Sequence, residues 1–342
     1  MASAISLNRA HSHVVQLQFP GNVKRAVRDD PRRIAIVGAR GWIGRTALAL
    51  LHDALGPGAF AQRVICFGSQ AGVVDISEGL TAEQRPLSEL TAQRPQPTLL
   101  LHLAFLTMDK VANMDAGEYA HANRELSQAV YDALDQIGVD RLFVASSGAA
   151  AFADNPSAAT ELRLYGKLKR ADEEMFAHWA NRDPQQRRAA IGRIYSVSGP
   201  YINKHETYAL AGFILDALAG RPIEVRAPMR VLRSYVAVRE LVSLVFAMLL
   251  ASNGSTLLRF ETGGEALELS ELAVRVAGRL GGHVNRAPIS VSATNRFVGD
   301  HEAWSALLAG HHLEHLPLDA QIAETAEYLA GKSRARINVA SV

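Results

Sequence analysis

The chain has 342 residues, of which 48% are hydrophobic, and its 36 basic and 34 acidic side chains give a net charge of +2. A chain of this length can bury a large core, and we expect two closely associated lobes. The balanced charge gives no argument for binding nucleic acid. Because no run reaches the ~20 apolar residues of a membrane span and residues 1–31 hold no apolar signal core, we expect a cytoplasmic protein with no membrane partner.

Apolar runs alternate with helical patterns after an N-terminal extension over residues 1–31. Strands are predicted at 34–37, 64–67, 98–103 and 141–145, and helices at 43–55, 113–136 and 162–180. This alternation predicts a parallel sheet. Further along, we expect a strand at 189–195 and helices at 208–218, 238–250 and 270–278.

Basic residues gather just before the first strand. Asp29 and Asp30 interrupt the group, so we expect a solvated surface. Its members are Lys24, Arg25, Arg28, Arg32 and Arg33. The single cysteine, Cys66, excludes an intramolecular disulfide, and its apolar neighbours predict a buried strand residue.

Three glycines follow the first strand and open the next helix. Gly38 permits a tight turn, Gly41 lets backbone amides approach phosphates, and Gly44 lets the helix pack closely. A helix N-terminus in this setting suits a pyrophosphate, so the pattern favours a dinucleotide site over a purely structural turn. The expected cofactor contacts are Gly38, Arg40, Gly41, Trp42, Ile43 and Gly44.

The end of the second strand indicates which nicotinamide cofactor is used. NAD sites usually carry an acidic side chain there, whereas this chain has Cys66-Phe-Gly-Ser-Gln70. A 2′-phosphate suits Ser69 and Arg40, so NADP(H) is favoured over NAD(H). The alternative is that Arg40 is only a solvated loop residue.

Tyr165 and Lys169 stand four residues apart in a predicted helix and therefore share one face. A phenol that works near pH 7 needs its pKa lowered by roughly three units, about 4 kcal/mol, to which a nearby ammonium and an oxidised nicotinamide ring contribute. The pair thus predicts a proton-transfer site. The competing interpretation is an ordinary amphipathic helix, because apolar residues line the same segment.

Further motifs in the same order make residues 32–330 similar to the extended short-chain dehydrogenase/reductase family. They are His102-Leu-Ala-Phe105, Asn123, Ser146-Ser-Gly-Ala149, Arg193-Ile-Tyr-Ser-Val-Ser-Gly-Pro200 and Arg233-Ser-Tyr-Val236. The resemblance implies an α/β fold with a Rossmann-type doubly wound parallel sheet over residues 32–195. It also implies a smaller α/β C-terminal substrate lobe over 196–342, with segments near 232–250 returning to the first unit.

The resemblance also assigns roles to individual residues. Tyr165 is the catalytic acid/base, Lys169 is its electrostatic partner and holds the nicotinamide ribose, and Ser147 polarises the substrate oxygen, with Ser146 as a second candidate. Leu103 and Ala104 are assigned to the cofactor, and Tyr208 and Arg233 to the substrate. A homodimer through helices 113–136 and 162–180 is implied, although their apolar stripes could instead pack on the sheet.

The expected substrate is a nucleotide-linked sugar, and the favoured reaction is reduction of a 4-ketosugar by NADPH. Two alternatives remain open: a 4-epimerase with tightly bound NAD, and a catalytically silent cofactor-binding or sensor protein. Dehydration is disfavoured because Gly148-Ala149 stand where dehydratases carry an Asp-Glu pair. Epimerases that invert carbons beside a ketone need an extra acid/base, for which only His205 or Tyr208 is a candidate.

His311, His312 and His315 lie within about one helical turn. No cysteine or convergent carboxylate set accompanies them, so we expect a polar surface turn and no metal.

Overall fold

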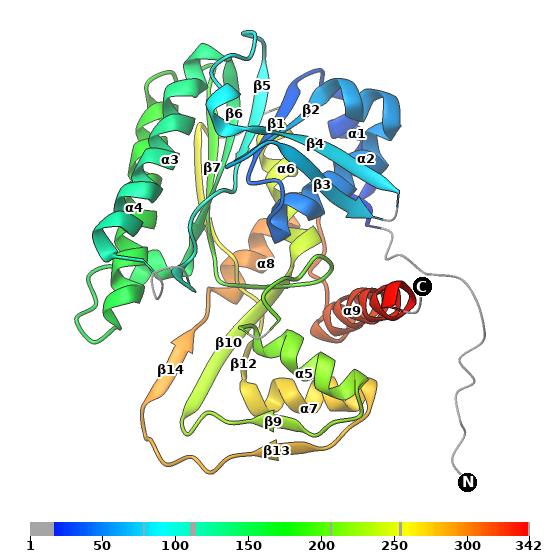
Figure 1. Cartoon of the computed structure of the whole chain (residues 1–342). Helices are drawn as coiled ribbons and strands as arrows, with labels where there is room; N and C mark the ends of the chain where they lie inside the picture. Colours follow the sequence, from blue (N-terminus) through cyan, green and yellow to red (C-terminus); the bar gives the residue numbers. More distant parts are fainter. Residues whose placement is uncertain (1–16, 78, 110–113, 206, 253–254, 341–342) are drawn as a thin grey trace.

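The computed structural model describes residues 17–77, 79–109, 114–205, 207–252 and 255–340. Its larger part is an eight-stranded sheet with strand order β11-β7-β6-β5-β1-β2-β4-β3, in which every neighbouring pair is parallel except β3 with β4 (Figure 1). The strands are β1 (Arg33–Val37), β2 (Val64–Gly68), β3 (Gly72–Ser77), β4 (Leu80–Pro86), β5 (Thr98–His102), β6 (Val139–Ser147), β7 (Arg188–Ile194) and β11 (Leu257–Glu261).

Helices cover both faces of this sheet. Because side chains alternate along each strand, a central strand such as β1 contributes residues to the core on each face. Ile34 and Ile36 of β1 belong to the core under α1 (Gly21–Asp29), α2 (Trp42–Arg63) and α6 (Val238–Leu250). Ala35 and Val37 belong to the core under α3 (Ala116–Gln136) and α4 (Thr160–Asn181). The predicted Rossmann-type fold is confirmed, and Cys66 is buried in β2 as expected.

The smaller part lies at the carboxyl edge of the large sheet (Figure 1). Strands β12, β10 and β14 form its sheet, β8 also pairs with β10, and β9 pairs with β13. Its elements are β8 (Ser196–Ser198), α5 (Ala209–Leu218), β9 (Ile223–Val225), β10 (Arg230–Ala237), β12 (Ala266–Glu268), α7 (Leu269–Leu280), β13 (Val284–Arg286), β14 (Thr294–Phe297), α8 (His301–Gly310) and α9 (Leu318–Ala340). Between them, α6 and β11 return to the first unit.

Strand β11, the β3–β4 hairpin and helix α1 of the first unit were not predicted. The β3–β4 hairpin closes one edge of the sheet, and only Val74 and Ile76 of β3 are buried apolar residues, which is too short a pattern to mark a strand in the sequence. Helix α1 lies within the predicted extension and packs on α2 and α6, with the rings of Phe19 and Phe246 5.3 Å apart. Residues 17–31 are therefore part of the folded unit, and residues 1–16 lie outside the described residues.

The expectation of a solvated basic surface before β1 was wrong for Arg32 and Arg33, whereas Arg25 and Arg28 are exposed. Arg33 is buried, and its guanidinium donates to the carbonyl oxygens of Ile137 and Arg94 at 2.9 and 3.0 Å. Arg32 forms an ion pair with Asp140 at 2.8 Å. The partners lie far along the chain, at the amino edge of the sheet, so the sequence did not reveal these contacts.

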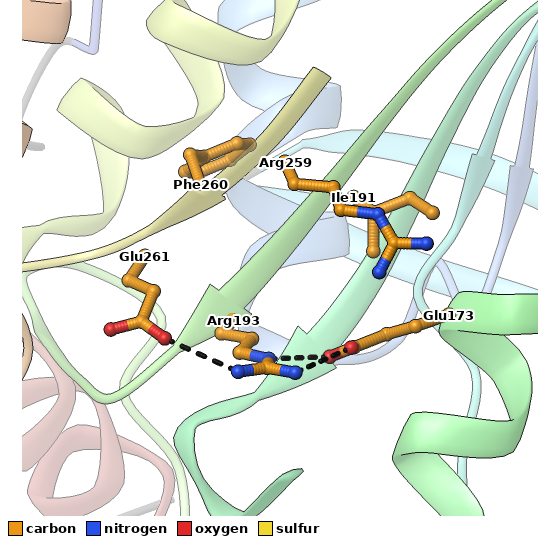
Figure 2. Close-up of a pocket in the computed structure, with 6 residues that line it drawn as sticks. All are labelled: Glu173, Ile191, Arg193, Arg259, Phe260 and Glu261. Atoms are coloured by element: carbon orange, nitrogen blue, oxygen red, sulfur yellow. Dashed lines mark hydrogen bonds and ion pairs between the residues drawn. The ribbon is translucent and has the colours of Figure 1, made fainter. Parts of the chain in front are cut away.

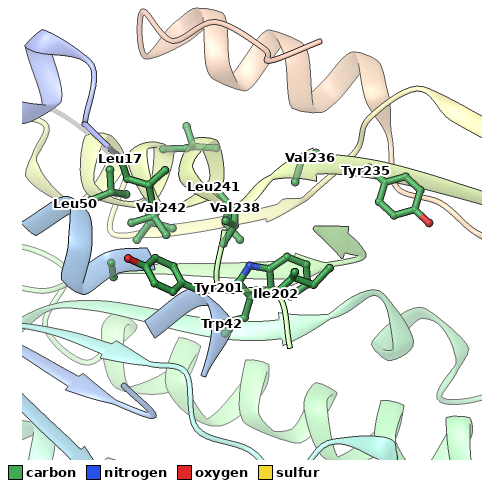
Figure 3. Packing of buried hydrophobic residues seen from close by; sticks show 14 of the residues in the cluster. Leu17, Trp42, Leu50, Tyr201, Ile202, Tyr235, Val236, Val238, Leu241 and Val242 are labelled. Atoms are coloured by element: carbon green, nitrogen blue, oxygen red, sulfur yellow. The ribbon is translucent and has the colours of Figure 1, made fainter. Parts of the chain in front are cut away.

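One continuous core joins the two parts. Figure 3 shows Trp42, Tyr201 and Ile202 packed beneath Val238 and Val242 of α6. The indole of Trp42 donates to the carbonyl oxygen of Pro200 at 2.7 Å, which ties the start of α2 to the connection between the two parts. In the described part of the chain, no helix is long and apolar enough to cross a membrane.

Candidate active site

The glycine loop lies against the segment that follows β5. Gly38 has φ +96°, and a Cβ there would lie 2.7 Å from the amide nitrogen of Ala104. A Cβ on Gly44 would lie 2.6 Å from the carbonyl oxygen of Gly38, so two of these positions admit only glycine. The Leu103 amide donates to the Val37 carbonyl at 2.9 Å. The loop and the Leu103-Ala104 segment, both predicted to contact the cofactor, are therefore adjacent.

The start of α2 suits a pyrophosphate. Its N-cap, Gly41, has no side chain to accept hydrogen bonds from the first turn. First-turn amides lack acceptors within their own helix, so those of Trp42, Ile43 and Gly44 suit phosphate oxygens. This donor set fits a bound dinucleotide.

Arg40 and Ser69 lie near the end of β2, where a 2′-phosphate is expected. The Arg40 guanidinium donates to the carbonyl oxygen of Val73 at 3.4 Å. A Cβ on Gly72 would lie 2.3 Å from its Nη2, so this glycine gives the guanidinium room. Both supporting residues belong to the hairpin that sequence patterns did not predict. Ser69 is exposed just beyond β2.

Ser147, Tyr165 and Lys169 meet at the carboxyl end of β6. The Ser147 hydroxyl accepts from the Ala149 amide at 3.2 Å, and its interaction with the Tyr165 hydroxyl acts to lower the pKa of that phenol. Lys169, one turn along α4, donates to the carbonyl oxygen of Ala145 at 2.8 Å. A Cβ on Gly166 would lie 2.3 Å from the Ala149 carbonyl oxygen, so this glycine lets α4 pack directly on the 3-10 helix η3 (Gly148–Phe152).

Ser146, the second candidate serine, has a different partner. Its hydroxyl donates to Glu173 at 2.5 Å, and Glu173 also accepts two hydrogen bonds from Arg193 at 2.8 and 2.9 Å. Figure 2 shows Arg193 between Glu173 and Glu261 at the edge of a pocket that none of the predicted site residues lines. The geometry therefore favours Ser147 as the partner of Tyr165.

Burial sets the protonation of the central pair. It raises the pKa of Tyr165 above its ordinary value, although the hydrogen bond with Ser147 opposes this shift. It also lowers the pKa of Lys169 to about 8, against the attraction of Asp172 and Glu173. Near neutral pH the phenol is therefore protonated and the ammonium is charged.

The two predicted substrate residues come from the smaller part. Tyr208 occupies the N-cap position of α5, and its ring packs edge-to-face on Trp42 with centroids 5.6 Å apart. Arg233 donates to the Asn295 side chain at 3.1 Å and lies over the Phe297 ring at 6.0 Å. His205 contacts the carbonyl oxygen of Ile202 at 3.0 Å.

Sequence reasoning missed an aromatic group beside Ser147. The Phe297 ring lies 4.8 Å from that of Tyr195 and 6.1 Å from that of Phe152. A Cβ on Gly148 would lie 2.5 Å from the Tyr195 ring. The rings come from η3, β14 and the residue after β7, so only the tertiary structure brings them together.

The histidine group is not simply a polar surface turn. His315 is half-buried, and its Nδ1 lies 3.0 Å from the carboxylate of Glu240. The buried Glu240 carboxylate holds it there, a partner 75 residues away that the sequence could not reveal. Within the ranges that the structure describes, no cluster of three or more histidine, cysteine or carboxylate side chains is arranged to hold a metal ion.

The apolar stripes of α3 and α4 pack on the large sheet. Val130 and Leu134 of α3 and Phe176 and Trp179 of α4 are buried in the same core as the strands. Among the described residues, no large exposed hydrophobic side chain lies on either helix. A homodimer through these helices stays a prediction, and it would need contacts other than these stripes.

The chain matches a known protein family over more than half of its length. A family model described as the NAD dependent epimerase/dehydratase family matches residues 34–257. The chain belongs to this family. Its members are extended short-chain dehydrogenases/reductases, which confirms the resemblance inferred from the motifs. No curated protein sequence matches the chain.

Solved structures of epimerases and dehydratases share the fold. An epimerase from Methanothermobacter thermautotrophicus is 14% identical with a TM-score of 0.67, over 92% of this chain and 97% of that one. The UDP-glucose 4-epimerase of Thermotoga maritima, with UDP-glucose, is 17% identical with a TM-score of 0.65, over 88% and 99%. A double mutant of the dTDP-glucose 4,6-dehydratase of Streptomyces venezuelae, with NAD bound, is 16% identical with a TM-score of 0.63, over 86% and 96%.

Proposed function

We propose that this epimerase/dehydratase family member is an oxidoreductase that uses NADPH to reduce a nucleotide-linked 4-ketosugar. The meeting of Ser147, Tyr165 and Lys169 at the sheet edge that also carries the glycine loop is the observation on which the proposal rests. Bound NADPH supplies a hydride. Tyr165 donates a proton to the carbonyl oxygen of the substrate, and the Ser147 hydroxyl orients that oxygen by a hydrogen bond.

The protonation of the site supports the direction of reduction. Because burial raises the pKa of Tyr165, the phenol is neutral and ready to donate. After donation, the ammonium of Lys169 stabilises the phenolate through its charge. Since the pKa of Lys169 is about 8, we expect the rate of reduction to fall as the pH rises through that value.

NADPH is proposed because no acidic side chain follows β2 to select NAD, while Ser69 just beyond β2 and Arg40 in the glycine loop suit a 2′-phosphate. For the substrate, Arg233 supplies a positive charge for a diphosphate, and the Thermotoga neighbour was solved with UDP-glucose. Dehydration is disfavoured further by the structure, because the Tyr195 ring leaves no room for an acidic side chain in place of Gly148.

A 4-epimerase with tightly bound NAD is the second candidate. The family description and the epimerase neighbours favour it. It needs the same hydroxyl pair, so the two candidates differ in whether the cofactor is consumed.

The test is to mix the full-length protein with NADPH or NADH and with UDP- or dTDP-linked 4-ketosugars, following cofactor oxidation. We expect NADPH oxidation, and we expect Tyr165→Phe to lower kcat about 10²–10⁴-fold without weakening NADPH binding. If cofactor co-purifies with the protein, and if the protein epimerises a UDP- or dTDP-linked sugar that carries a 4-hydroxyl, the epimerase would be established instead. Unchanged activity of Tyr165→Phe would rule out both mechanisms.

A further inference from the structure

The ring of Phe105 contacts both members of the proposed catalytic pair. The Lys169 Nζ lies 3.6 Å from the centroid of this ring. The ring also meets that of Tyr165 edge-on, with centroids 5.7 Å apart and an interplanar angle of 69°. Lys169 is only 5% exposed, so the aromatic face takes the place that water would have around a surface ammonium.

The segment that carries Phe105 is held firmly by α3. The Leu106 amide donates to the side chain of Asn123 at 2.8 Å, and the Tyr119 hydroxyl donates to the Leu106 carbonyl at 2.6 Å. Tyr119 and Asn123 are themselves buried. Because both the amide and the carbonyl of Leu106 are hydrogen-bonded to α3, the backbone next to Phe105 is fixed and its ring has a defined place beside Lys169.

An ammonium has three N–H groups, and two are accounted for here. One is donated to the carbonyl oxygen of Ala145, and one faces the ring of Phe105. We propose that Phe105 is a positioning residue for Lys169: its ring face binds the ammonium and directs the remaining N–H to the nicotinamide ribose or the Tyr165 oxygen. This inference rests on the proposed function only through the role of Lys169.

Three other titratable side chains, His102, Asp172 and Glu173, interact with Lys169. Burial lowers the pKa of His102, at the end of β5, to about 3, so its imidazole is neutral. On α4, Asp172 and Glu173 attract the ammonium, but Glu173 is already paired with Arg193. Removing the aromatic face therefore removes a stabilising contact from the charged form of Lys169, and its pKa should fall.

The experiment measures the titration of Lys169 in the full-length protein labelled with ¹³C at the lysine ε-carbons, assigned with Lys169→Arg. Phe105→Leu keeps apolar bulk without a π face, and Phe105→Tyr restores the face. We expect Phe105→Leu to lower the titration midpoint by about 0.4–1.5 pH units and Phe105→Tyr to leave it near wild type. The alkaline limb of the kcat profile should move with the midpoint.

A matched control removes another cation–π contact. Tyr131 lies under the Arg182 guanidinium at 5.9 Å, on the contact of α3 with α4, and Tyr131→Leu should leave the Lys169 midpoint unchanged. An unchanged or raised midpoint in Phe105→Leu, or equal shifts in the Leu and Tyr variants, would overturn the proposal.

Two further measurements test the contact between Phe105 and Lys169 even if the Phe105→Leu variant does not fold or the proposed function is wrong. If Phe105→Leu does not fold, the wild type still decides, because a ring 3.6 Å from Nζ must move the ε-proton resonances of Lys169 upfield of the other lysines. Resonances at the ordinary position would refute the contact. Full activity of Lys169→Met would defeat the proposed function and leave the ring contact standing, because the titration needs no turnover.

Discussion

At the scale of one residue, Lys169 shows that a buried functional group can lower the stability of the folded state. Its ammonium is buried, and burial lowers its pKa from 10.5 to about 8. A charge that is harder to hold in the folded state than in the unfolded state destabilises the protein wherever both states are protonated.

We therefore expect Lys169→Met to raise the free energy of unfolding by about 1–3 kcal/mol at pH 7 while it abolishes turnover. In wild type, Lys169 keeps its proton up to pH 10.5 in the unfolded state but only up to about pH 8 in the folded state. The free energy of unfolding of wild type therefore rises between these two pH values, and its difference from that of Lys169→Met disappears. Urea titrations at pH 7 and pH 10 measure this. Lys167→Met, at an exposed position on the same helix, should change little, and a less stable Lys169→Met would contradict the prediction.

Element packing places Tyr165 beside Ser147. Helix α4 approaches η3 so closely that a side chain at position 166 would collide with the backbone of Ala149. The placement of the Tyr165 hydroxyl beside the Ser147 hydroxyl therefore depends on Gly166, where α4 contacts η3 after the end of β6.

Gly166→Ala should push α4 away from η3, lowering stability by about 1–3 kcal/mol and kcat by at least tenfold. Gly278→Ala in α7 is the matched control, because nothing lies within 4 Å of its added methyl. It should stabilise the protein by about 0.5–1 kcal/mol without altering kcat. Thermal unfolding and turnover of both variants are the measurements, and equal behaviour of the two would show that the close contact is not needed.

For the whole molecule, the buried Glu240 carboxylate joins the two parts. From α6 it accepts hydrogen bonds from the Trp304 indole at 2.6 Å and the Leu316 amide at 2.8 Å, and it lies 3.0 Å from His315 Nδ1. The hydrogen bond with Glu240 raises the pKa of His315 above 6.5.

A raised pKa means that protonated His315 contributes its full stability below pH 6.5 and that this contribution disappears as the pH rises through the folded-state value. We expect the unfolding free energy of wild type to fall over this window, and that of His315→Gln to fall less. His121→Gln, which removes a solvent-exposed histidine paired with Glu125, should follow wild type. Parallel curves of unfolding free energy against pH for wild type and His315→Gln would show that protonation of His315 beside Glu240 does not stabilise the fold.

The sequence by itself determined the alternation of strands and helices, the glycine loop and the candidate pair Tyr165 and Lys169. Each depends on local periodicity, turn geometry or a spacing of four residues, which neighbouring residues specify. The choice between Ser146 and Ser147 lay beyond it, because the side chains that distinguish these adjacent serines, Glu173 and Tyr165, both sit on α4.

Only the tertiary structure decided the rest. The burial of Arg33, the β3–β4 hairpin under Arg40 and the Phe105 ring beside Lys169 depend on contacts between residues 33 to 104 positions apart. Such contacts have no local signature, because a polar or aromatic side chain looks the same in sequence whether it meets water or a distant partner. Folding alone brings the partner to it.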